Sequence, residues 1–111
     1  MLNLNIAVNT YPVCINGTTY QANVVGLRAV KGIKEFGEKV TAGDFEFEWL
    51  CDEIGRTMRT FFGPKGDEIV DVYGEASAIE ILTSLITDPD YLDAVTAFAK
   101  KKDGRQAFSR F

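Results

Sequence analysis

Apolar side chains recur at steps of three and four residues along one stretch of the chain, residues 44–63. This spacing places them on one stripe of an α-helix, which we expect to form the centre of the core. Asp44 is the expected N-cap of the helix, and Gly63 followed by Pro64 is its expected end. The positions expected to be buried on the stripe are Phe47, Leu50, Cys51, Ile54, Met58, Phe61 and Phe62.

The N-terminal region has the pattern of β-strands. Residues 2–8 alternate between apolar and small or polar side chains, which is typical of a half-buried strand. Asn16 and Gly17 stand between two β-prone runs, and this pair favours a two-residue hairpin turn because a type I′ turn needs positive φ at both central residues. The sequence therefore predicts a hairpin, with the first strand optionally alongside it, formed by residues 12–16 and 18–23.

Downstream of the hairpin the apolar period becomes helical. Segment 24–40 has an apolar face, although its three glycines weaken the prediction. Its start has two interpretations, because Val24 and Val25 could also extend the preceding strand. Further amphipathic runs predict helices at 75–86 and 89–102, and residues 67–73 could form a short helix as well.

These elements predict one α+β domain spanning residues 1–111. We expect an N-terminal β-hairpin or small antiparallel sheet followed by about four packed α-helices. The β region is residues 1–23 and the helical region is residues 24–102. Residues 103–111 contain Gly104 and no sustained period, so we expect a loose tail there.

Composition and charge exclude several classes of protein. The chain has 111 residues, a net charge of -4 and a sequence pI of about 4.8, which argues against binding to nucleic acid. No apolar run approaches the roughly 18 to 20 residues that span a bilayer, and the N-terminus lacks the basic start of a signal peptide. We therefore expect a cytoplasmic protein, in which Cys14 and Cys51 are more readily free thiols than a disulfide.

The sequence offers little catalytic chemistry. Histidine is absent, so the commonest general base and metal ligand are missing. The segment 63–66 lacks the remaining pattern of a phosphate-binding loop. We expect the acidic pairs to cap helices or face solvent, so the prediction is a non-enzymatic protein with no catalytic residue, cofactor or metal site. These pairs are Asp52 with Glu53, Asp67 with Glu68, and Asp88 with Asp90.

Two features are candidates for contact with a partner. Phe45 and Trp49 project from the polar side of the predicted central helix, which indicates either a partner surface or burial by other helices of the same chain. Lys100, Lys101 and Lys102 follow an acidic body. This run either solvates a helix end or forms a docking tail for an acidic or extended partner.

The layout of the chain resembles that of the tail assembly chaperones of long-tailed phages and prophages. The resemblance rests on the hairpin segment 15–20, which contains Ile-Asn-Gly and a following tyrosine, and on the segment FFGPKGDEIVDVYG at residues 61–74. Many proteins of this family have a Phe-Gly pair at this point, then an apolar stretch and a second Phe-Gly pair. In this chain the second pair is Tyr73-Gly74. The likeness covers most of residues 10–100.

The resemblance implies a non-enzymatic role in the cytoplasm of a bacterial host. Proteins of this family bind the long tape measure protein and keep it soluble while tail tube subunits gather around it. The implied partners are thus the tape measure protein and, as a second candidate, the tail tube protein, and a homo-oligomeric state stays open. The alternatives are a virion structural subunit, such as a head–tail connector or tail tube component, and a small ligand-binding domain.

Overall fold

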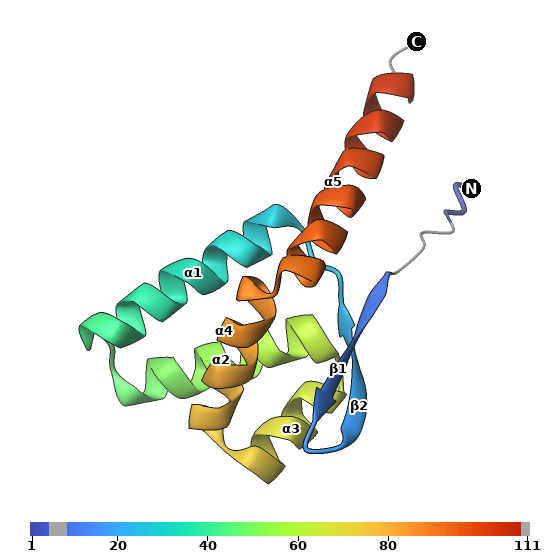
Figure 1. The fold of residues 1–111 in the computed structure, drawn as a ribbon. Coiled ribbons are helices and arrows are strands. Elements are labelled where there is room, and N and C mark those ends of the chain that lie inside the picture. Colours follow the sequence, from blue (N-terminus) through green and yellow to red (C-terminus); the bar gives the residue numbers. More distant parts are fainter. Residues whose placement is uncertain (5–8, 110–111) are drawn as a thin grey trace.

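The computed structural model describes residues 1–4 and 9–109 of the chain, with side chains described up to residue 100. It confirms the α+β class: a two-stranded antiparallel sheet precedes the helices, which pack beside it (Figure 1). The described residues form five helices, one of which is the short helix considered at residues 67–73, and it begins at Lys65. The elements are β1 (Thr10–Ile15), β2 (Thr18–Asn23), α1 (Leu27–Ala42), α2 (Phe47–Phe62), α3 (Lys65–Tyr73), α4 (Glu75–Thr87) and α5 (Pro89–Ser109).

The hairpin has the predicted turn. Asn16 and Gly17 have φ values of 48° and 86°, the left-handed conformation that a type I′ turn requires. The register pairs Ile15 with Thr18 across the turn. The expected strand at residues 2–8 is not part of the described sheet: residues 1–4 are irregular and exposed, and residues 5–8 lie outside the described residues.

Helix α2 lies at the centre of the core, as the apolar stripe predicts. Its C-terminal half is buried against α3, β2 and α4. Phe47 contradicts the prediction, because 76% of its surface is exposed. It is the first residue of α2 and lies beyond the reach of the elements that cover the rest of the stripe. The buried core comprises Ala22, Val24, Val25, Val30, Ile33, Phe36, Ile54, Met58, Phe61, Phe62, Ile69, Ala78, Leu82, Leu85, Ile86, Tyr91 and Val95.

Two helix starts differ from the expected positions. Helix α1 begins at Leu27, three residues after the predicted start, because the Val24 N–H donates to the Asn9 carbonyl (2.9 Å) and prolongs the hairpin ladder. Helix α2 begins at Phe47, so Asp44 is not its N-cap. The Asp44 N–H instead donates to the Lys39 carbonyl at the end of α1.

The end of α5 also differs from the prediction. The helix continues to Ser109 and projects beyond the body of the molecule (Figure 1), whereas the apolar period predicts its end near residue 102. Arg105, Gln106 and Ala107 are good helix formers, and they continue the helix past the single Gly104. Residues 110–111 lie outside the described part of the chain.

Gly66 sets the distance between α2 and α3. A Cβ at this position would lie 2.8 Å from the backbone nitrogen of Arg59 and still closer to the Met58 carbonyl oxygen. Both atoms belong to the backbone of α2, so they cannot move aside as a flexible side chain would. Only glycine allows α3 to turn back onto α2 this closely.

Tyr91, which the sequence pattern does not single out, joins the hairpin to the helices. Its side chain is fully buried at the start of α5, where the hydroxyl donates to the Asn23 carbonyl (2.7 Å) and accepts the Val25 N–H (3.4 Å). Its ring packs edge-on against Tyr11, with centroids 5.5 Å apart, and lies 6.3 Å from the ring of Phe61. One side chain thus contacts both strands, the link to α1, and α2.

We predict that Gly66→Ala destabilises the protein. The new methyl group meets backbone atoms of α2, so α3 must shift, at an expected cost of about 1–3 kcal/mol in the free energy of unfolding. Urea denaturation followed by far-UV circular dichroism measures this cost. Gly32→Ala on α1 is the matched control, because a Cβ there meets nothing within 4 Å. The control should be neutral or more stable by up to about 1 kcal/mol. Equal effects of the two substitutions would contradict the close-approach argument.

We predict that Tyr91→Phe lowers stability at neutral pH and flattens its alkaline loss. The substitution removes the partner of the part-buried Asn23 carbonyl and of the buried Val25 N–H, which costs about 1–3 kcal/mol. Burial raises the pKa of the Tyr91 phenol above 10.0, and the bond from the Val25 N–H opposes this to a smaller extent. The resulting stabilisation is present below pH 10 and is lost as the pH rises through the folded-state pKa.

Denaturation midpoints measured between neutral pH and about pH 11 test this prediction. The decline with rising pH should be shallower in the variant than in the parent protein. It should not vanish, because the pKa values of Tyr11 and Tyr20 are also raised. An unchanged alkaline decline would show that Tyr91 does not contribute to it.

Candidate functional site

The aromatic residues chosen from the sequence as a partner surface separate into two environments. Trp49 is half-buried: its ring lies 5.8 Å from that of Phe36 on α1, and Lys39 Nζ lies 4.7 Å from its centroid. Phe45 precedes α2, so it does not form a helical pair with Trp49. The structure therefore supports the second interpretation for Trp49, in which other helices of the same chain cover it.

Phe45 and Phe47 are the exposed aromatic residues among the described side chains, and we call them the aromatic tip. Their exposed fractions are 37% and 76%. Asp44, Glu46 and Glu48 alternate with them along the chain. The spacing of apolar residues did not indicate that Phe47 is exposed. This spacing shows which face of a helix is apolar, but it does not show how far along the helix axis other elements cover that face.

The basic run lies far from the aromatic tip. Lys100 is exposed on α5, and the side chains of Lys101 and Lys102 lie outside the described residues. Figure 1 shows this part of α5 beyond the body, on the opposite side from the connection between α1 and α2. The two sequence-predicted contact regions therefore do not form one site.

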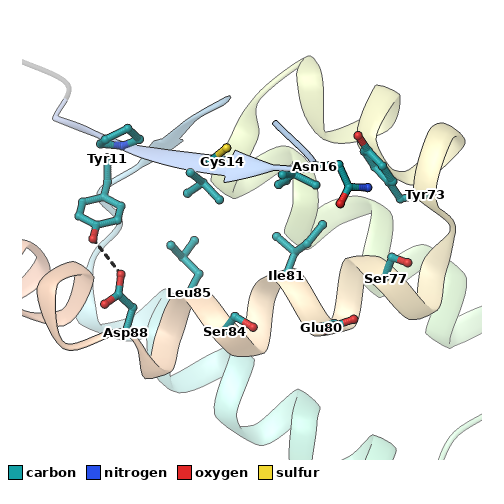
Figure 2. A pocket seen from close by; sticks show the side chains of 13 residues that line it. Tyr11, Cys14, Asn16, Tyr73, Ser77, Glu80, Ile81, Ser84, Leu85 and Asp88 are labelled. Carbon is teal, nitrogen blue, oxygen red and sulfur yellow. Dashed lines mark hydrogen bonds between the residues drawn. The ribbon is translucent and has the colours of Figure 1, made fainter. Parts of the chain in front are cut away.

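A groove between β1 and α4 was not foreseen from the sequence (Figure 2). It has a volume of about 480 Å³. Ile81 and Leu85 point from α4 toward β1, and Ser77, Glu80 and Ser84 lie along the same helix. Strand β1 precedes α4 by about sixty residues in the sequence, so the two walls of the groove meet only in the folded protein. Tyr11, Val13 and Ile15 line the strand side.

One end of the groove is closed by a hydrogen bond. The Tyr11 hydroxyl donates to Asp88 Oδ2 at 2.8 Å. This bond is the largest cause that raises the pKa of Tyr11, followed by desolvation. Asp88 Oδ1 also accepts the Asp90 N–H at 3.3 Å, which agrees with its expected capping of α5. Both carboxylate oxygens thus have structural partners.

The other acidic pairs lie on the surface. Glu53 binds Arg56 at 2.7 Å, Asp67 binds Arg59 at 3.0 Å, and Glu68 binds Lys65 at 3.1 Å. Asp52 is exposed. Within the described residues, no group of three or more cysteine, aspartate or glutamate side chains is placed to hold a metal ion. Cys14 and Cys51 are both free thiols.

No family model, no curated protein and no solved structure matches this chain. Among the described residues, no helix combines the length and the apolar character that crossing a membrane requires.

We predict that Phe47→Ala and Trp49→Ala have different effects on stability. Phe47 contributes little to the core, so its substitution should change the free energy of unfolding by less than about 0.5 kcal/mol. Trp49 packs on Phe36, and its loss should cost about 2 kcal/mol, less than for a fully buried ring. Far-UV circular dichroism in urea measures both effects. A greater loss for Phe47→Ala would mean that the tip is packed in solution.

Proposed function

We propose that this protein is a non-enzymatic tail assembly chaperone of a long-tailed phage or prophage. It binds the tape measure protein and keeps it soluble in the bacterial cytoplasm during tail assembly. The observation that carries the proposal is the exposure of the aromatic tip. It is joined by the resemblance of segments 15–20 and 61–74 to the chaperone family.

The aromatic tip has the chemistry that a client-binding contact needs. Large rigid aromatic side chains supply apolar contact area at little cost in conformational entropy. An amphipathic client helix places apolar residues at steps of three and four, which suits two neighbouring aromatic anchors. The acidic residues 44, 46 and 48 keep this end of the protein hydrated when no client is bound.

The projecting end of α5 provides a second candidate contact. Lys100, Lys101 and Lys102 suit an acidic stretch of the tape measure protein, or the tail tube protein, as a partner. Their distance from the aromatic tip means that one extended client would contact both regions only by spanning the body of the protein. Substitution of each region separately would resolve their contributions.

We predict that the double variant Phe45→Ala, Phe47→Ala loses chaperone activity while remaining folded. On co-expression with the cognate tape measure protein, the soluble fraction of that client should fall several-fold. The variant should remain folded with only a small drop in melting temperature, because Phe47 is 76% exposed and Phe45, at 37%, lies outside the buried core. Val72→Ala removes a side chain that is 65% exposed on α3 and serves as the matched control.

Two results would contradict the proposal. One is unchanged client solubility with the double variant. The other is recovery of the protein in purified phage particles as a ring or tube component, which would favour the virion-subunit alternative. Size-exclusion chromatography of the purified protein with and without client distinguishes a stable ring from a chaperone complex.

A further inference from the structure

Charged residues are unevenly distributed around the groove between β1 and α4. Residues 1–27 contain no charged side chain, and residues 66–99 contain acidic residues but no lysine or arginine. Strand β1 belongs to the first segment and α4 to the second. Among the described residues that line the groove, none is basic. The acidic residues of the second segment are Asp67, Glu68, Asp71, Glu75, Glu80, Asp88, Asp90 and Asp93.

Both charged residues in the described lining of the groove, Glu80 and Asp88, are acidic, so we expect the groove to attract positive charge. Glu80 is exposed beside it and forms no ion pair within the described part of the chain. Asp88 lies at the end where Tyr11 binds it. A partner with lysine or arginine would meet complementary charge here, whereas an acidic partner would be repelled.

In the described sheet β1 pairs with β2 alone, so its other edge, beside the groove, has no strand partner. In the hairpin register, Ile15 pairs with Thr18 next to a two-residue turn, and the Asn9 carbonyl accepts the Val24 N–H. Odd-numbered residues of β1 therefore exchange hydrogen bonds with β2, and even-numbered residues point their backbone groups away from it. Those even-numbered residues are Thr10, Pro12 and Cys14.

An added strand would continue the sheet at this edge. It would lie about 4.8 Å from β1 and hydrogen-bond to Thr10 and Cys14. Pro12 and Cys14 border the same groove as Ile81 and Ser84, and α4 runs along β1 (Figure 2). Alternate side chains of the added strand would thus point toward α4. In a segment that alternates apolar and basic residues, the lysine or arginine side chains share this face: their aliphatic stems would pack on Ile81, and a charged head group would reach Glu80.

We infer that the groove between β1 and α4 is a docking site for an extended segment of a partner protein that alternates apolar residues with lysine or arginine. The inference does not depend on the tape measure proposal, because it rests on a different surface. It identifies the partner segment by backbone conformation, side-chain period and charge.

Two features disfavour a second copy of this chain as the occupant. If two β1 strands paired about their midpoints, Pro12 would face Pro12, and neither residue has an N–H to donate. A two-fold arrangement would also bring two acidic α4 faces together. A separate basic segment loses only the one hydrogen bond that Pro12 cannot donate.

Fluorescence anisotropy with the full-length protein tests the inference. The probe is a fluorescein-labelled seven-residue peptide that alternates lysine with valine, and the matched control peptide has glutamate in place of lysine. We expect the lysine peptide to bind and the glutamate peptide to bind at least tenfold more weakly. Binding should weaken several-fold when the salt concentration rises from about 0.05 to 0.3 M, because exposed charges are screened.

Substitutions in the protein test whether the lysine peptide binds in the groove. Glu80→Gln should weaken the lysine peptide about three- to tenfold, and Ser84→Arg should abolish binding by placing a cation in the groove. Glu75→Gln removes the same charge from the same helix outside the groove lining and should change the affinity by less than twofold. Amide chemical shifts of Thr10 and Cys14 should move on titration in NMR spectra.

Three results would overturn the inference. The first is equal binding of both peptides, and the second is equal loss of affinity in Glu80→Gln and Glu75→Gln. The third is a dimer in sedimentation experiments that Ser84→Arg dissociates, which would make a second copy the occupant. The Phe45→Ala, Phe47→Ala variant should still bind the lysine peptide, so failure here and failure of the chaperone proposal are distinguishable.

Discussion

The buried hydroxyl of Tyr91 is the contact on which the rest of the arrangement depends. A two-stranded hairpin is marginally stable in water by itself, so this one needs packing against helices. Tyr91 supplies that packing and satisfies the backbone where β2 ends and the chain turns toward α1. Its edge contact with Tyr11, together with the bond from Tyr11 to Asp88, also fixes β1 relative to α4. The groove exists because these two tyrosines hold its walls in place.

Features that depend on residues close together in the sequence were predicted correctly, and features that depend on distant residues were not. The Asn16-Gly17 turn and the buried face of α4 depend on residues close in sequence, and both are as expected. The spacing of apolar residues predicts that Phe47 is buried, because it lies on the apolar face of α2. Burial also requires that another element covers this first turn of the helix, and Phe47 is exposed. The apolar period of α5 ends near residue 102, but the helix runs on to Ser109, because a helix needs backbone hydrogen bonds and not an apolar face.

The candidate sites were less predictable than the fold. Periodicity cannot report that Gly66 touches the backbone of α2, nor that Tyr11 reaches Asp88 across most of the chain. The groove is formed by residues that are unremarkable in sequence, a short strand and a helix with small polar side chains. Trp49 was a reasonable choice for a partner surface, yet α1 provides both an aromatic ring and an ammonium group to cover it.

The two surfaces proposed for binding differ in what they recognise and in where they lie. The aromatic tip offers apolar area at one end of the helical layer, and the groove offers backbone hydrogen bonds and negative charge beside the hairpin. The absence of histidine bears on both, because histidine is the side chain whose ordinary pKa lies nearest to neutrality. Recognition through the groove should therefore be insensitive to modest acidification and respond to ionic strength instead. A bound segment would be released by salt and retained through a drop in pH.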